Sequence, residues 1–200
     1  MTDITIRRGE TWTRVLRWES APFVYSAITA ITKTAPVQIT SPTHGLVTGW
    51  RAAVVSAGGM RQINAKTFPP RSTDFHKVTR VDANIITMND VNSADFTAYT
   101  SGGFLVSYTP VSLDGFSARM MIRETVESTG DPLVSLVSPD DIELDDADHT
   151  ITVTISAAAT AALEFSTGVY DLELVSGDAT PVVTRLLSGN VIVIPEVTRP

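Results

Sequence analysis

Residues 39–55 read ITSPTHGLVTGWRAAVV, residues 58–68 read GGMRQINAKTF, and residues 81–103 read VDANIITMNDVNSADFTAYTSGG. Each block is a short run of residues that favour β-strands, closed by glycine, proline, asparagine or aspartate. None of the blocks carries a group suited to catalysis. The stretch from Thr40 to Gly103 therefore predicts a small all-β module.

The surrounding sequence extends this pattern. Turn signals recur at short intervals as far as Ser101-Gly102-Gly103, and regularly spaced short strands are typical of a small barrel or sandwich. Pro36 interrupts the β-branched run 29–40, which predicts an edge strand or a break between strands. The strands expected between the turns are 51–55, 73–80, 85–88 and 104–108.

After Pro110 the pattern changes to longer alternating strands. Apolar and polar residues alternate over 116–124, and Ile151, Val153 and Ile155 alternate with threonines. Ser156 is a natural N-cap for a short helix over 156–163. Strands are also expected at the start of the chain around the Arg8-Gly9-Glu10 turn, over 169–175 and 182–187 as a hairpin, and over 191–194. This order is typical of an immunoglobulin-like β-sandwich without its cysteine pair.

The composition narrows the possible functions. The chain has 200 residues, of which 43% are hydrophobic, enough to form a core. Its 15 basic and 22 acidic residues give a net charge of −7, which argues against binding nucleic acid or an anionic membrane. The absence of cysteine excludes disulfides, a thiol nucleophile and cysteine-based zinc sites. The opening MTDITIRRGE has no apolar signal core, so we expect no secretion by the usual route.

Three segments resemble the N-terminal module of phage baseplate upper proteins. They are VSLDGFSARM at 111–120, ITVTIS at 151–156 followed by an Ala/Thr-rich helix, and GVYDLEL at 168–174. The opening IRRGETW at 6–12 is similar to the strand and Arg-Gly-acidic turn with which that family begins. The resemblance covers about half of the chain and implies a structural role in a tailed-phage virion.

In that family the opening strand leads quickly to the segment that here begins at Val111, whereas this chain places roughly eighty residues between them. The intervening piece resembles a half-domain named after ubiquitin-activating enzymes. That name implies no activity here, because the catalytic cysteine of those enzymes lies elsewhere and this chain has no cysteine. We therefore expect a discontinuous sandwich over 1–28 and 106–200, with an inserted small β-barrel or sandwich over 29–105.

The candidates for chemistry are weak, and we expect no catalytic residue, cofactor or metal. His44 lies in Pro42-Thr43-His44-Gly45, where a histidine that bonds its own loop is more plausible than a general base without a partner. The acidic run 140–148 lacks the glycine and final glutamate of an EF-hand loop, so we expect a solvated loop, with calcium binding as the alternative. The glycine pairs at 58–59 and 102–103 precede no Lys-Ser/Thr, which excludes a P-loop.

Two stretches have residue types that are common at protein interfaces. Tryptophan and arginine dominate binding hot spots, and the N-terminal stretch is rich in both. The loop 68–71 is apolar and stiff, and we expect it to be exposed. The alternative is that Trp12 and Trp18 belong to the core with the arginines on the other face of the strands, and that the loop is an ordinary turn. The expected interface residues are Arg7, Arg8, Trp12, Arg14, Arg17, Phe68, Pro70 and Arg71.

The sequence thus predicts a non-enzymatic virion protein, assembled in the host cytoplasm and located in the tail. Its expected partners are baseplate-ring or fibre proteins and further copies of itself in a symmetric oligomer. One alternative is a capsid decoration protein. Another is a glycan-binding module, which needs a cluster of exposed aromatic residues. Trp12, Trp18 and Trp50 lie far apart in the sequence and give no such platform.

Overall fold

The computed structural model describes residues 2–197 and has an all-β fold. Strands and their connecting turns make up nearly all of it, together with α1 (Ala157–Ala161) and two short 3-10 helices, Arg61–Ile63 and Ser72–Asp74. The strands are β1 (Ile4–Arg7), β2 (Trp12–Leu16), β3 (Glu19–Ala27), β4 (Ala30–Ile31), β5 (Val37–Thr40), β6 (Arg51–Val55), β7 (His76–Arg80), β8 (Ile85–Met88), β9 (Phe104–Pro110), β10 (Phe116–Arg123), β11 (Val134–Val137), β12 (Ile142–Asp145), β13 (Thr150–Ile155), β14 (Thr167–Ser176) and β15 (Val183–Ile194).

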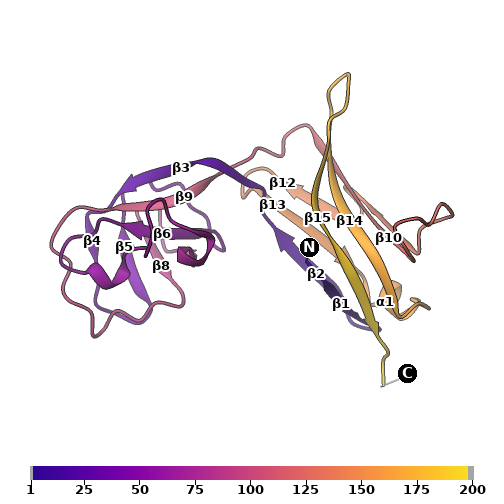
Figure 1. Cartoon of the computed structure of the whole chain (residues 1–200), viewed down its shortest axis with the longest axis horizontal. Helices are drawn as coiled ribbons and strands as arrows, with labels where there is room; N and C mark the ends of the chain where they lie inside the picture. The colour runs from indigo at the N-terminus through magenta and orange to yellow at the C-terminus, as the bar shows by residue number, and fades with distance from the viewer. Residues whose placement is uncertain (1, 198–200) are drawn as a thin grey trace. The chain divides into compact units, whose positions relative to one another are not determined.

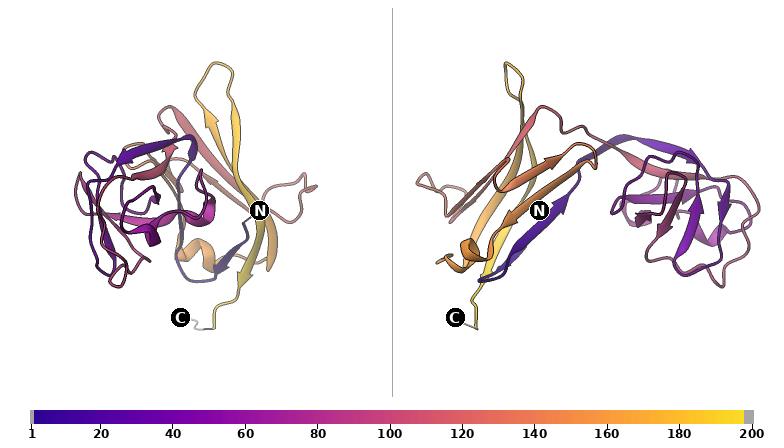
Figure 2. Two further views of the ribbon diagram at one scale, coloured as in Figure 1. Left: turned by 60° about the vertical axis from the view of Figure 1, so that its left-hand side comes forward. Right: turned by 180° about the vertical axis from the view of Figure 1, so that it is seen from behind.

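The chain divides into two compact units (Figures 1 and 2). The terminal unit contains the described residues up to Trp18 and from Pro110 onward, and the inserted unit is Glu19–Thr109. These boundaries differ from the expected 28/29 and 105/106. The reason is that β3 pairs with β9, so the whole of 19–27 joins the inserted unit. Strand β9 also continues past residue 105, as far as Pro110.

Two sheets enclose the core of the terminal unit. One has the order β1-β15-β14-β10-β11 and the other the order β12-β13-β2. Alternation sends every second side chain inward, and Ile6, Ile122 and Leu174 from the first sheet share one core with Ile142 and Ile151 from the second. Strand β1 pairs in parallel with the end of β15, which joins the two ends of the chain. The immunoglobulin-like topology expected for this unit stays a prediction.

The inserted unit is built from a seven-stranded curled sheet with the order β3-β9-β6-β7-β8-β5-β4. Its core includes Ile39, Ile86, Met88 and Leu105, each at most 2% exposed. The two glycine pairs meet here, since Gly58 N–H donates to the Ser101 carbonyl at 2.8 Å. A side chain on Gly59 (φ +76°) would collide with the Ala98 carbonyl. The glycines therefore allow two turns to touch.

Several expected elements differ from the structure. The strand expected over 73–80 begins at His76, after a 3-10 turn. The acidic run expected to be a loop contains β12, because Ile142 and Leu144 alternate with its acidic residues and face the core. The expected strands 182–187 and 191–194 are one strand, β15, with a register shift opposite Leu172/Glu173. The helix and its Ser156 cap are confirmed: Ser156 Oγ accepts from Ala159 N at 3.2 Å.

Candidate functional site

The N-terminal candidates do not form one surface. Arg7 is exposed on β1, opposite Ile194 of the five-stranded sheet. Arg14 lies on β2 of the other sheet and points the same way as Trp12, which packs against the core. Burial raises the pKa of Tyr170, and the charge of Arg14 opposes this rise, so Arg14 lies close to that buried ring. The alternative that the arginines line the face away from the tryptophans is therefore wrong for Arg14.

Arg8 makes hydrogen bonds within the terminal unit, and Arg17 is partly covered there. Arg8 donates from Nε and Nη2 to the carbonyl of Ala161 at 3.3 and 2.7 Å, and fastens the first turn of the chain to the end of α1. Thr160 Oγ1 supports the same joint by donating to the Glu10 carbonyl at 2.8 Å. Arg17 is half-buried. Of these residues Arg7 has the most accessible position for a partner, and Arg8 is occupied within its own unit.

The 68–71 loop lies in the inserted unit and is held by Asp74. Phe68 is 74% exposed and Arg71 is exposed, but Pro70 is buried, which corrects the expectation of a wholly exposed loop. Asp74 Oδ2 accepts from Arg71 N at 2.9 Å and from Thr67 Oγ1 at 3.0 Å, while Oδ1 accepts from Lys66 N at 3.1 Å. Hydrogen bonds from the Arg71 and Lys66 backbones lower the pKa of Asp74. The loop is therefore rigid, with Phe68 and Arg71 accessible.

A groove of about 620 Å³ lies on the outer face of the five-stranded sheet, in the terminal unit. Its floor comes from β10, β14 and β15, and the segment after β10 contributes Thr125 and the 81%-exposed Val126. Arg123 Nη1 donates to the carbonyls of Ser128 and Gly130 and so holds the loop that follows β10. The charged side chains of the groove are Arg119, Arg123, Asp171, Glu173 and Arg185.

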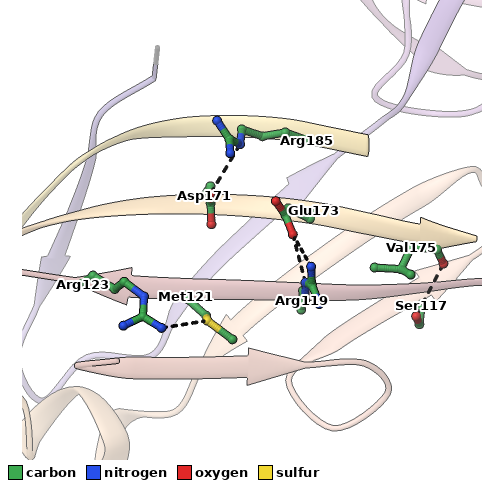
Figure 3. A network of polar contacts seen from close by, with 8 residues as sticks. All are labelled: Ser117, Arg119, Met121, Arg123, Asp171, Glu173, Val175 and Arg185. Atoms are coloured by element: carbon green, nitrogen blue, oxygen red, sulfur yellow. Dashed lines mark hydrogen bonds and ion pairs between the residues drawn. The ribbon is translucent and has the colours of Figure 1, made fainter. Parts of the chain in front are cut away.

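Ion pairs arrange these charges in a fixed order across the strands (Figure 3). Arg119 of β10 donates to Glu173 Oε2 of β14 from Nε at 2.9 Å and from Nη2 at 2.8 Å. Arg185 of β15 lies 3.4 Å from Asp171 Oδ2 on the same face. Both arginines are about half exposed or more, with side-chain exposures of 48% and 61%. The face therefore presents preorganised, partly hydrated charges beside the thioether of Met121, which suits binding to another protein.

Sequence reasoning missed the groove although its signal was present. Charged residues stand at every second position of strands whose other side chains are core, as in Asp171 and Glu173 between Tyr170, Leu172 and Leu174. Such alternation assigns the charges to the solvent face. Pairing them across β10, β14 and β15 requires the strand order, which the sequence did not supply.

The histidines and acidic residues have simple structural roles. His44 is 5% exposed, and its Nδ1 accepts from Leu46 N at 3.0 Å, so the expected histidine that bonds its own loop is confirmed. Burial lowers the pKa of His44. His76 Nδ1 lies 3.0 Å from both oxygens of Asp90. Within residues 2–197, no group of three or more histidine, cysteine or acidic side chains is placed to hold a metal ion.

Asp146 anchors the segment that leads into β10 through two hydrogen bonds. Its Oδ1 accepts from Leu113 N at 2.6 Å and from Ser112 Oγ at 2.8 Å. The hydrogen bond from the Leu113 backbone is the main cause that lowers the pKa of Asp146, and the bond from Ser112 adds to it. This residue of the acidic run thus serves to anchor the segment that leads into β10.

Comparisons with known proteins add no family assignment. No model of a known protein family matches the chain, and no curated protein matches it. Among the described helices, none has the length and apolar character needed to cross a membrane.

Proposed function

We propose that this protein is a non-enzymatic structural component of a tailed-phage virion, located in the baseplate, the tail tip or the fibre attachment. Its partners are neighbouring tail proteins and further copies of itself in a symmetric ring. It assembles in the host cytoplasm. The proposal rests on the resemblance of four sequence segments to baseplate upper proteins and on how those segments pair in the fold.

The pairing of these segments is the observation that carries the proposal. The opening segment and ITVTIS are separated by more than a hundred residues in the chain, yet the opening segment leads into β2, which pairs with β13 so that Trp12 is opposite Ile155. VSLDGFSARM and GVYDLEL also form adjacent strands, in which Met120 is opposite Leu172. The segments similar to one family thus belong to one compact unit, and the Thr40–Gly103 stretch belongs to the other. This arrangement supports a family module that tolerates an insertion.

Docking through rigid surfaces is the mechanism that we propose. The outer groove of the terminal unit offers arginines held by Glu173 and Asp171, which limits the entropy lost on binding. Charged groups at the rim of an interface mainly set specificity and association rate. The net charge of −7 favours solubility before assembly and attraction to basic surfaces of neighbouring proteins.

Mass spectrometry of density-purified particles tests the proposal. The protein should be present in several copies per particle and should remain after a high-salt wash that removes loosely bound host proteins. Its absence from washed particles, together with recovery from the soluble lysate, would overturn the proposal. Recovery with isolated heads rather than tails would move the protein to the capsid, as a decoration protein.

A further inference from the structure

Aromatic side chains gather on one side of the β3–β9 pair in the inserted unit. Phe23 contacts Tyr108 with ring centroids 4.7 Å apart, and both rings contact Phe75, at 5.7 and 5.1 Å. Farther along the same two strands, Tyr25 and Phe104 meet edge to face at 6.2 Å. Alternation along each strand places Phe23 with Tyr25 and Phe104 with Tyr108 on a common face. We call these five residues the aromatic surface.

On β9 this surface lies on the side opposite to Leu105, and Val106, which shares that side between Phe104 and Tyr108, is fully buried. Leu105, which follows Phe104 and therefore points the opposite way, belongs to the core of the inserted unit and is 2% exposed. Tyr25 and Phe104, by contrast, are 44% and 43% exposed. Phe23, Phe75 and Tyr108 are half-buried and pack against one another. Three rings thus form a support, and two rings are open to a ligand.

Polar groups suited to hydroxyls stand on the same face. Glu19 of β3 has a side chain that is only 13% exposed, so it serves mainly as the ion-pair partner of Arg51. Arg51 of β6 reaches Glu19 with 3.6 Å between Nη2 and Oε2, and its side chain is 52% exposed. A guanidinium supplies several fixed donors and a carboxylate supplies acceptors. The aromatic surface is therefore flanked by the accessible donors of Arg51.

We infer that the aromatic surface binds a neutral oligosaccharide, with pyranose rings on Tyr25 and Phe104 and a hydroxyl on Arg51, which Glu19 holds in place. The C–H face of a pyranose carries partial positive charge and is attracted to the negative face of an aromatic ring. Ligand sites commonly combine aromatic walls with a few oriented polar groups. The inference goes beyond the structural role proposed above and applies equally to a tail or a capsid location.

A small ligand fits the accessible area better than a protein does. With side-chain areas of about 150–250 Å² per aromatic residue, the exposed parts of Tyr25 and Phe104 amount to roughly 200 Å². A stable protein interface buries about 800 Å² on each partner. Two rings and an ion pair match the size of one to three sugar units, and they leave a protein–protein contact short of apolar area.

Titration of the purified full-length protein with maltotriose, cellotriose and triacetylchitotriose, followed by NMR, tests the inference. At least one trisaccharide should shift the ring signals of Tyr25 and Phe104. Tyr25→Ala or Phe104→Ala should weaken binding by about tenfold, since one aromatic contact contributes up to that factor. Tyr25→Phe keeps the ring and should retain binding. Phe68→Ala, which removes a 74%-exposed ring elsewhere in the same unit, is the matched control.

Three results would overturn the inference. The first is the absence of ring shifts with all three trisaccharides. The second is equal loss of binding in Phe68→Ala and Tyr25→Ala. The third is concentration-dependent self-association that Tyr25→Ala abolishes, which would assign the surface to a second copy of the chain. Unchanged melting of each variant shows that its fold is intact, and Tyr25→Phe serves where Tyr25→Ala does not fold. The titration uses isolated protein, whereas the proposed virion role is tested on purified particles. A failure of sugar binding can therefore be told apart from a failure of the virion role.

Discussion

Arg119 and Glu173 form an ion pair with two hydrogen bonds on the outer sheet face of the terminal unit. Two nitrogens of Arg119 donate to the same oxygen of Glu173, at 2.9 and 2.8 Å, and the residues face each other across β10 and β14. The arginine side chain is 48% exposed, so water screens the pair and its contribution to stability is modest. Its main effect is to hold a charged group in one orientation above the groove.

Replacement of Arg119 or Arg185 by alanine should change the stability of the protein little and should reduce its incorporation into particles. Each change should lower the free energy of unfolding by less than about 1 kcal/mol, because both pairs are solvent-exposed. Incorporation into particles should fall by about fivefold or more if either arginine is a hot spot of the docking face. Urea unfolding and quantitative blotting of purified particles measure the two effects. Arg61→Ala, an exposed arginine of the inserted unit, is the control.

Trp12→Ala should destabilise the terminal unit. Trp12 is half-buried against the core, opposite Ile155, and buried tryptophans cost about 3–5 kcal/mol on truncation. With part of the ring already exposed, we expect about 2 kcal/mol, measured by urea unfolding. Thr13→Ala, on the exposed side of the same strand, should change little. Unaltered unfolding in Trp12→Ala would instead make this tryptophan an interface residue, as the sequence suggested.

Asp146 should give the protein part of its acid sensitivity. Its pKa in the folded state is lowered from 3.8, mainly by the hydrogen bond from Leu113 N. A carboxylate with a lowered folded-state pKa stabilises the fold above pH 3.8, and this contribution is lost as the pH falls through the folded-state value. In Asp146→Asn the urea midpoint should decrease less between pH 5 and pH 3 than it does in the unchanged protein. Asp148→Asn controls for the change in net charge; equal slopes in the two variants would contradict this role.

His44 should make the stability of the fold depend on pH in a higher range than Asp146 does. Burial lowers its folded-state pKa from 6.5, so the unfolded chain takes up a proton at a pH where the folded protein does not. The contribution of His44 is complete above pH 6.5 and is lost as the pH falls toward its folded-state pKa. Urea midpoints should therefore fall from pH 7 to 5. His44→Asn, whose side-chain oxygen can accept from Leu46 N, should flatten this slope; a slope that survives in the variant would exclude His44 as its source.

Asp74→Ala should release the loop that contains Phe68. Loss of the carboxylate leaves the backbone N–H groups of Lys66 and Arg71 without their acceptor. We expect faster cleavage by trypsin after Lys66 and Arg71 and a lower melting temperature. Asp95→Ala, an exposed aspartate of the same unit, is the control. Identical cleavage rates in the two variants would show that the loop is held by other contacts.

Strands with clear alternation or sharp turns were predictable from the sequence. The expected bounds 51–55 and 85–88 agree with β6 and β8, and the Ser156 cap is where the pattern placed it. Strand β3 was missed because its burial does not alternate, and Pro22 lies within it. Strand β12 was missed because acidic residues obscured the alternation of Ile142 and Leu144.

Surface sites were less predictable because they depend on strand order. Trp12 and Trp18 pack against the core of the terminal unit, and Trp50 is buried in the core of the inserted unit. The aromatic surface instead combines phenylalanines and tyrosines from positions as distant as Phe23 and Tyr108. The interface candidates Arg7 and Arg14 are close in sequence, but they lie on different sheets. Sequence spacing alone therefore gave the elements and not the surfaces that they share.

Gold labelling of intact particles, viewed by electron microscopy, tests the central claim most directly. A full-length copy with a gold-binding tag, or an antibody against the protein, should mark the tail end in a small symmetric cluster. Label that concentrates at the tail tip or baseplate is the result that we predict. Particles without label, in a preparation where a known tail protein is labelled, would contradict the account.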